Sequence, residues 1–317
     1  TALVYDLGGW TFDVSIITPK GPLFKVQATG GKHDLGGRDV NDLLLEDALD
    51  SFESQHGFRP TPEDNPVFFQ DLFGRIEQVK ITLSAREKAT LNVSCNGKLL
   101  RQPLARKGFE SRIAPLVGET MDITQEVLED AGLNWDDIDM VIPVGGCSAI
   151  PLVKEQLNKI SGQKVSNQCE PLYAAAYGAV IAGRIEKERK GEEYMVGNKR
   201  LPSTGMSLED VVGNPIGVLA LDESDELVAS EILSRNTTVP SEQTKLYRTA
   251  APNQTDVLIQ VVQAPEGTPK GQCVILGEFR LEGLPQNPDC TERIEITFEF
   301  DINGMLQAVA RDKQSGK

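Results

Sequence analysis

Histidine is nearly absent from this sequence, and its scarcity limits the chemistry that the chain can perform. The 317 residues include only His33 and His56, so a histidine-based catalytic triad or metal site is not expected. Cysteine is also sparse, and no two cysteines form a C-x-x-C pair. Neither a disulfide framework nor a zinc site is indicated, and a reducing, cytoplasmic location is expected. The five cysteines are Cys95, Cys147, Cys169, Cys273 and Cys290.

Long apolar runs are missing as well. No segment approaches the run of about 18 apolar residues that a membrane helix requires, and no signal peptide is recognisable. The formal net charge is −15, so phosphate groups would be repelled, and neither a nucleic-acid nor a membrane partner is expected. The chain opens directly on the apolar segment 2–5, which suggests that it begins inside a longer protein.

The length allows two domains with separate cores, and the pattern of apolar and polar residues changes along the chain. Residues 1–187 alternate apolar strand patterns with helical periodicity, which predicts a layered α/β domain. The expected strands are 1–5, 11–18, 23–29 and 138–144, and the expected helices are 40–52, 66–84, 109–131 and 171–190. Residues 188–213 show little periodicity and are interpreted as an interdomain linker.

From residue 214 onward the sequence consists of short strand patterns and turns. Ile294, Ile296 and Phe298 alternate with polar residues, the period of two that a half-buried strand requires. Asn303-Gly304 follows this strand and predicts a two-residue hairpin turn. The pattern favours a β-sandwich or a small half-barrel over residues 214–317.

Three glycine turns follow strands in the first domain. The segment Asp6–Asp13 contains Gly8 and Gly9, where backbone N–H groups could approach an anion closely because no Cβ intervenes. Asp6 could hold a metal-bound water there, and Thr11 offers a hydroxyl. One such turn alone would more often be a structural hairpin. Two further turns, at Gly36-Gly37 and Gly145-Gly146, suggest a shared nucleotide crevice.

Eight segments, spread over both predicted domains, form a distinctive series of motifs. They are D-L-G-G-W-T-F-D-V-S, L-G-G-R-D, E-Q-V-K-I-T-L-S, V-G-G-C-S-A-I-P, A-A-Y-G-A, N-T-T-V-P, I-E-I-T-F-E-F and A-R-D-K-Q-S-G-K. In order and spacing they resemble the motifs of DnaK-type 70-kDa heat-shock chaperones, and the resemblance covers nearly the whole chain except parts of 54–64 and 184–206. It implies the second lobe of an actin-like (ribonuclease-H-like) ATPase over residues 1–187 and a β-sandwich peptide-binding domain over residues 214–317.

The resemblance also implies roles for individual residues around ATP or ADP with magnesium in the complete parent. Asp6 and Thr11 would be catalytic, and no metal-ligating residue is assigned. Glu77 and Lys80, taken alone, are better explained as a helix salt bridge. The implied nucleotide-binding residues are Gly8, Gly9, Gly37, Glu77, Lys80, Ser84, Gly145 and Gly146.

Four positions depart from the family pattern. Trp10 stands where the family has a third glycine, which places an indole beside the phosphate site. Ile81 and Ala149 replace two arginines that sandwich the adenine in the family. Because a desolvated cation–π contact is worth about 2 kcal/mol, nucleotide binding is expected to be weak. Cys147, with no histidine nearby in sequence, is interpreted as a packing residue.

The resemblance further implies that the family's first ATPase lobe, last β-strand and helical lid lie outside this sequence. The chain alone is therefore not expected to hydrolyse ATP, although its parent would. An unpaired sheet edge would favour self-association. Partners implied by the resemblance are extended apolar peptides, J-domain proteins and nucleotide-exchange co-chaperones.

A cleft for extended peptides is implied in the second domain. The alternative is that the same side chains simply form the core of the sheet structure. A sugar kinase or a filament protein of the actin-like fold also stays open, although neither type would carry residues 214–317 as a peptide-binding domain. The implied peptide-binding residues are Val218, Leu221, Tyr247, Ala250, Val257, Ile259, Ile294 and Ile296.

Overall fold

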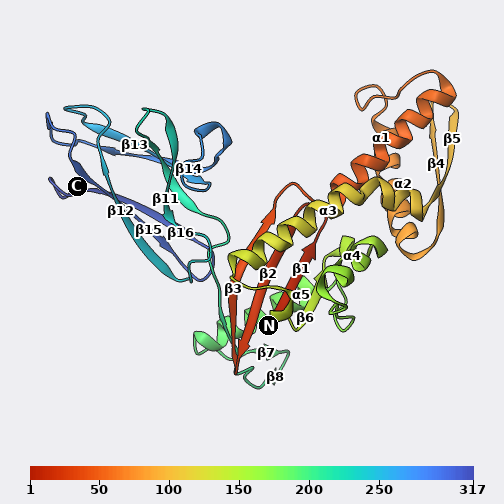
Figure 1. Cartoon of the computed structure of the whole chain (residues 1–317), viewed down its shortest axis with the longest axis horizontal. Helices are drawn as coiled ribbons and strands as arrows, with labels where there is room; N and C mark the ends of the chain where they lie inside the picture. Colours follow the sequence, from red (N-terminus) through yellow and green to blue (C-terminus); the bar gives the residue numbers. More distant parts are fainter. The chain divides into compact units, whose positions relative to one another are not determined.

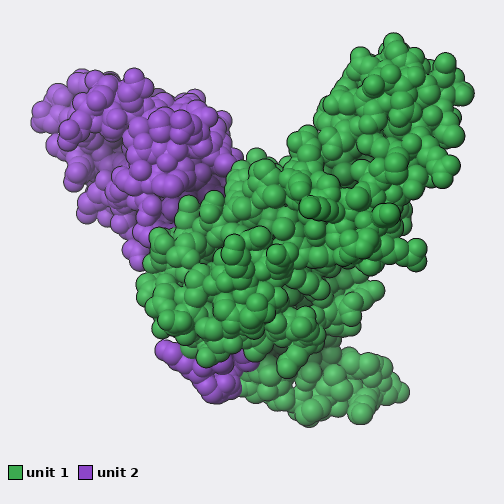
Figure 2. Space-filling model, turned by 45° about the vertical axis from the view of Figure 1, so that its right-hand side comes forward, with its two compact units in different colours: residues 1–18, 30–206 green, residues 19–29, 207–317 purple.

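The computed structural model describes residues 1–317, which separate into two compact units (Figure 2). The first unit comprises residues 1–18 and 30–206, and the second comprises residues 19–29 and 207–317. Figure 1 shows mixed strands and helices in the first unit and strands in most of the second. No helix of the chain is both long and apolar enough to span a bilayer.

A five-stranded sheet, in the order β6-β1-β2-β3-β9, supports the glycine turns. β1 (Ala2–Leu7) pairs antiparallel with β2 (Phe12–Lys20) and parallel with β6 (Met140–Val144). Alternate side chains of β1 and β2 are buried and belong to the hydrophobic core. Its remaining strands are β3 (Leu23–Lys32) and β9 (Ser207–Glu209).

The four predicted helices are present, with bounds that differ at their ends. The last one begins at Ala174 rather than at Pro171, because Glu170–Tyr173 form a turn whose Pro171 carbonyl accepts the N–H of Gly145 at 3.0 Å. A fifth helix, α4, follows the third glycine turn and was not predicted. The helices are α1 (Gly37–His56), α2 (Pro66–Ala85), α3 (Arg106–Asp130), α4 (Pro151–Ser161) and α5 (Ala174–Arg189).

An antiparallel hairpin between α2 and α3 was also not predicted. β4 (Lys88–Cys95) and β5 (Lys98–Ala105) are joined by Asn96 and Gly97, both with positive φ. The segment predicted as a linker contains short strands, β7 (Met195–Val196) and β8 (Lys199–Arg200) in the first unit and β9 in the second.

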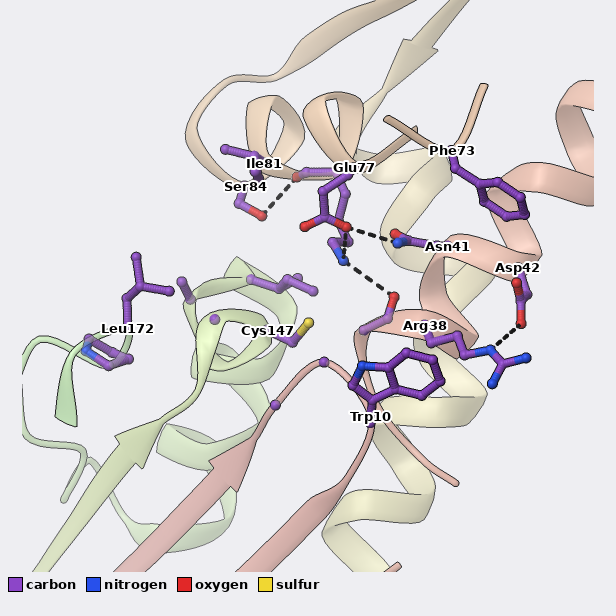
Figure 3. A pocket seen from close by; sticks show the side chains of 18 of the residues that line it. Trp10, Arg38, Asn41, Asp42, Phe73, Glu77, Ile81, Ser84, Cys147 and Leu172 are labelled. Atoms are coloured by element: carbon purple, nitrogen blue, oxygen red, sulfur yellow. Dashed lines mark hydrogen bonds and ion pairs between the residues drawn. The ribbon is translucent and has the colours of Figure 1, made fainter. Parts of the chain in front are cut away.

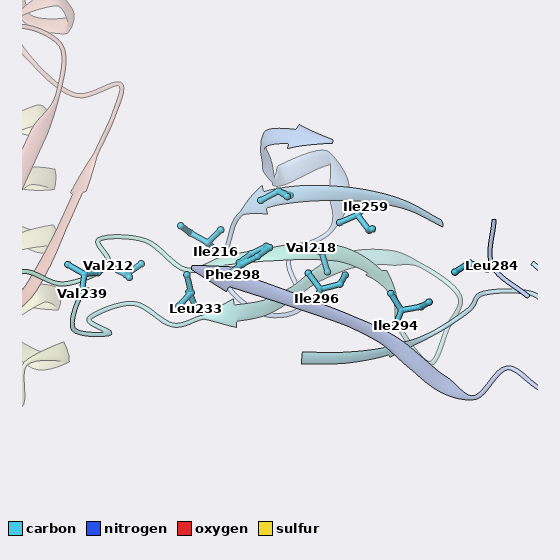
Figure 4. Packing of buried hydrophobic residues seen from close by; sticks show 11 residues of the cluster. Val212, Ile216, Val218, Leu233, Val239, Ile259, Leu284, Ile294, Ile296 and Phe298 are labelled. Carbon is cyan, nitrogen blue, oxygen red and sulfur yellow. The ribbon is translucent and has the colours of Figure 1, made fainter. Parts of the chain in front are cut away.

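Two antiparallel sheets make up most of the second unit. One has four strands in the order β11-β10-β13-β14, and the other has three in the order β12-β15-β16. Figure 4 shows Val218 and Ile259 of the first sheet in one hydrophobic cluster with Ile294, Ile296 and Phe298 of the second. The strands are β10 (Ile216–Leu221), β11 (Leu227–Leu233), β12 (Ser241–Arg248), β13 (Asp256–Gln263), β14 (Val274–Glu282), β15 (Glu292–Phe300) and β16 (Leu306–Asp312).

The two-residue turn predicted at Asn303-Gly304 is wrong. β15 and β16 pair in a register that puts Phe300 opposite Leu306, so five residues connect them. The Asp301 carboxylate explains the longer loop, because its Oδ1 accepts the backbone N–H groups of both Asn303 and Met305 at 2.8 Å. These bonds make Asn303-Gly304 part of a five-residue loop rather than a two-residue turn.

A buried ion pair, Arg293 with Asp312, lies at the end of the three-stranded sheet. The two side chains are 4% and 0% exposed and lie 3.6 Å apart. Burial opposes ionisation of Asp312, but hydrogen bonds from the Ser315 hydroxyl and from the backbone of Gln314 and Ser315 hold its pKa below the usual value. The carboxylate therefore stabilises the fold as an anion.

Replacing this carboxylate should destabilise the second unit in a pH-dependent way. Asp312→Asn should lower the free energy of unfolding near neutral pH by about 3 kcal/mol, because Arg293 loses its buried partner. The folded pKa is lowered, so the contribution is complete above the unfolded pKa of about 3.9 and disappears as the pH falls through the folded value. Urea denaturation across pH measures both effects.

Glu295→Gln is the matched control, because it removes the Glu295–Lys313 pair of the same sheet, whose side chains are 29% and 52% exposed. It should change the free energy of unfolding by about 1 kcal/mol or less. A loss for Asp312→Asn that stays constant down to strongly acidic pH would contradict the assignment.

Candidate functional site: a glycine-lined pocket and an apolar pocket

A cavity of about 900 Å³ lies in the first unit and is lined by parts of all three glycine turns. Helices α1 and α2 and the turn before α5 complete its walls (Figure 3). Of the residues predicted for nucleotide binding, seven line it: Gly8, Gly9, Gly37, Glu77, Lys80, Ser84 and Gly146.

The first two glycine turns pack backbone against backbone. Gly37 donates its N–H to the Gly8 carbonyl at 3.0 Å, and Arg38 donates to the Gly9 carbonyl at 2.8 Å. A Cβ at Gly36 would lie 2.8 Å from the backbone nitrogen of Trp10, which is closer than real Cβ contacts allow. A Cβ at Gly37 would lie 2.7 Å from the Cys147 sulfur and 3.1 Å from Lys80 Nζ. Glycine is therefore required at Gly36, where the obstruction is backbone, whereas a side chain at Gly37 would have to displace those of Cys147 and Lys80.

Helix α2 presents a buried ammonium group to the pocket. Lys80 is 7% exposed, and its Nζ lies 2.7 Å from Glu77 Oε2 and 3.3 Å from the Gly37 carbonyl oxygen. Asn41 of α1 donates to the same carboxylate oxygen at 2.8 Å. Partial burial opposes ionisation of Glu77, but the hydrogen bonds from Lys80 and Asn41 hold its pKa below the usual value. The helix salt bridge expected for Glu77 and Lys80 is thus present, within the pocket wall.

Three predicted site residues, Asp6, Thr11 and Gly145, do not line the cavity. Burial, and then the negative charge of Asp13, raise the pKa of Asp6, while the Thr11 hydroxyl donates to Asp13 Oδ2 at 2.9 Å. A cation beside this pair of carboxylates would relieve their repulsion. No group of three or more histidine, cysteine or carboxylate side chains is assembled for a metal ion anywhere in the chain.

The departures noted in the sequence all lie in this pocket. Trp10 is 66% exposed and Ile81 is 52% exposed, and both line the cavity with Ala149. Cys147 is buried there, and burial raises the pKa of its thiol, which agrees with a packing role rather than a reactive one.

Sequence reasoning missed several lining residues. Helical spacing could have indicated four of them. Arg38, Asn41 and Asp42 lie on one face of α1, and Phe73 precedes Glu77 by four residues on α2. The others, Ile150, Glu170, Pro171 and Leu172, reach the cavity only through the packing of the turns around it.

A second cavity, of about 430 Å³, lies in the second unit, and all eight residues predicted for peptide binding line it. Four of them, Val218, Ile259, Ile294 and Ile296, also belong to the hydrophobic core, so the core interpretation holds for these positions. Leu221 is instead 42% exposed at the rim. The Tyr247 hydroxyl bonds to Ser230 Oγ at 3.2 Å, and burial raises its pKa to about 12.

The model of the Hsp70 protein family matches residues 1–317. The chain belongs to the Hsp70 family. Membership carries the actin-like ATPase fold, and the mixed helices and sheets of the first unit agree with it.

Relatives of this chain include proteins named chaperone protein DnaK. The protein from Halobacterium salinarum is 36% identical over 322 residues, which cover 100% of this chain and 48% of the relative. The protein from Thalassiosira pseudonana is 34% identical over 323 residues, which cover 100% of this chain and 50% of the relative. The chain thus spans about half the length of the curated relatives it matches. A sugar kinase or filament protein is not favoured by this end-to-end match.

The third glycine turn provides a sharp test of the packing. Gly145 has φ +82, and a Cβ there would overlap the Leu7 carbonyl oxygen, so Gly145→Ala should lower the free energy of unfolding by at least about 2 kcal/mol. Gly146→Ala is the matched control, because its Cβ would meet only Leu172 Cδ1 at 3.7 Å. It should change stability by about 0.5 kcal/mol or less. Equal denaturation midpoints for the two variants would contradict this description of the turn.

Proposed function

We propose that this chain is part of a DnaK-type molecular chaperone, with a nucleotide site in the first unit and a site for extended apolar peptides in the second. The observation that carries the proposal is that the residues named for peptide binding meet in one cavity. Eight residues that the family resemblance implied for peptide binding, spread over residues 218–296, line one cavity of a chain that the Hsp70 family matches throughout.

The first-unit cavity suits a nucleotide. Its volume falls in the range of about 300–1,000 Å³ that small-molecule sites occupy, and backbone at Gly8, Gly9 and Gly37 can approach phosphates. ATP or ADP is the proposed ligand. Asp6, with Asp13 beside it, is the carboxylate that would hold the accompanying magnesium through water. Thr11 is proposed to assist from the same turn.

The second-unit cavity suits an extended peptide. We infer that its two sheets form a β-sandwich, because they share one hydrophobic cluster. The buried floor of Ile259, Ile294 and Ile296 would receive an apolar side chain, and Leu221 at the rim would cover the peptide backbone. The proposed boundaries are residues 1–187, 188–213 and 214–317. J-domain proteins, exchange factors and a cytoplasmic location are proposed with this function.

Restoring cations at the apolar end of the first pocket should tighten nucleotide binding. The double variant Ile81→Arg, Ala149→Arg should bind ATP about tenfold more tightly by calorimetry, because each guanidinium could stack on the adenine. Arg75, an exposed arginine elsewhere on α2, shows that the helix accepts this side chain.

Val67→Arg is the matched control, since Val67 is 79% exposed on α2 and lies outside the pocket. It adds a positive charge to the same helix without adding a stacking partner. An equal gain in ATP affinity for Val67→Arg, or no gain for the double variant, would show that adenine does not bind at this end.

Filling the second pocket should abolish peptide binding. Val257→Phe should remove the anisotropy increase of a fluorescein-labelled, leucine-rich peptide while the circular dichroism spectrum stays unchanged. Val257 lines the pocket and is only partly buried, so the larger ring can enter the cavity at a local cost of about 1–3 kcal/mol.

Val274→Phe serves as control, because Val274 lies on the neighbouring strand β14, is 54% exposed and is outside the pocket. This variant should bind the peptide as the unmodified chain does. Normal binding by Val257→Phe would place the peptide elsewhere and remove the main support for the proposed chaperone site.

A further inference from the structure

Trp10 and Arg38 face each other at one end of the nucleotide pocket. The Arg38 guanidinium carbon lies 4.9 Å from the centre of the Trp10 ring, within the range of a cation–π contact. In Figure 3 the two side chains lie side by side, with Leu172 at the other end of the pocket. Trp10 is 66% exposed and the Arg38 side chain is 62% exposed, so this stack faces open space.

The position of Arg38 within its own helix is electrostatically unfavourable. It is the second residue of α1, and a positive charge in the first turn opposes the helix dipole. Its ion pair with Asp42 is long, at 3.8 Å, and both side chains are mostly exposed, so the pair stabilises little. Interactions inside the helix therefore do not explain an arginine here.

The backbone nevertheless fixes Arg38 beside the first glycine turn. Its N–H donates to the Gly9 carbonyl at 2.8 Å, and the preceding Gly37 N–H donates to Gly8 at 3.0 Å. The first N–H groups of α1 are therefore already bonded. An anion at this turn gains nothing from these two N–H groups, and a positively charged side chain would add to the backbone contacts that the glycines allow.

Arg38 is also the accessible cation of the pocket. The cavity has two basic lining residues, and the other one, Lys80, is buried and bonded to Glu77 and to the Gly37 carbonyl. The opposite end, around Ile81, Ala149 and Leu172, carries no cation. The attraction for a negatively charged ligand is therefore concentrated at the glycine turn.

We propose that Trp10 and Arg38 form a phosphate clamp, in which Arg38 binds the terminal phosphates of the nucleotide and Trp10 positions its guanidinium. The inference rests on the proposed nucleotide site. The guanidinium lies against the Trp10 ring and approaches the Asp42 carboxylate through Nε at 3.8 Å, so its two terminal nitrogens can match two phosphate oxygens at once. Affinity is then set by the number of phosphates, and inorganic tripolyphosphate binds the same clamp.

The test is calorimetry with ATP, ADP, AMP and tripolyphosphate on the whole chain. Arg38→Ala should weaken binding of ATP and tripolyphosphate at least about tenfold, the factor for loss of one charged hydrogen-bonding group. AMP binding should change far less. Arg38→Lys should bind ATP and tripolyphosphate with affinities between those of the unmodified chain and of Arg38→Ala, because lysine keeps the charge but lacks the planar guanidinium. Arg75→Ala, which removes another exposed arginine with an (i, i+4) ion pair, is the matched control and should match the unmodified chain.

Trp10 is tested as a positioning residue through rescue and fluorescence. Trp10→Gly should weaken tripolyphosphate binding severalfold, whereas Trp10→Phe should restore most of it because an aromatic face remains. Trp135 is the only other tryptophan. In a Trp135→Phe background, tripolyphosphate should change the emission of Trp10, and the change should vanish with Arg38→Ala.

The outcomes separate this inference from the proposed function. Nucleotide binding that is unaffected by Arg38→Ala overturns the clamp and leaves the nucleotide site standing. Arg38-dependent binding of tripolyphosphate without any binding of nucleotides supports the clamp and overturns the nucleotide site. Absence of binding by every ligand overturns both.

Discussion

The hydrogen bonds between the first two glycine turns position everything else in the first pocket. Gly8 and Gly9 offer their carbonyls to the N–H groups that begin α1, which ties a helix directly to the end of a strand. From there α1 carries Asn41 to the carboxylate of Glu77, and the Gly37 carbonyl receives Lys80. The two helices and the sheet edge are thus joined by polar contacts that a single Cβ at Gly36 or Gly37 would disrupt.

The second pocket depends on a different constraint, because the same strands contribute side chains both to the hydrophobic core and to the cavity. Ile259, Ile294 and Ile296 are almost fully buried and still line the pocket, so its floor is the outer surface of the core. Close packing makes such a floor rigid. Selectivity for a ligand is therefore left to partly exposed residues above it, such as Leu221 and Val257.

Local patterns predicted the helices well and the hairpins poorly. Two Asn-Gly pairs occur in hairpins, and only Asn96-Gly97 makes the two-residue turn, with Cys95 paired to Lys98. At Asn303-Gly304 the preceding Asp301 captures two backbone N–H groups and lengthens the loop. The dipeptide is the same in both places, so the outcome depends on a neighbouring side chain and on strand register. Likewise, the role of Leu172 in the pocket depends on where a turn folds back, which no periodicity reveals.

The motif residues divide into two physical classes, and this division explains why sequence recognition overestimated the lining of the first pocket. Glu77, Lys80 and Ser84 face the cavity because a helix presents them there. Gly145 lies behind it, where its missing side chain lets the third turn approach Leu7 and Asp6. A motif residue can either contact the ligand or allow the packing that shapes the ligand site. A sequence pattern does not distinguish these requirements, whereas the space around each Cβ does.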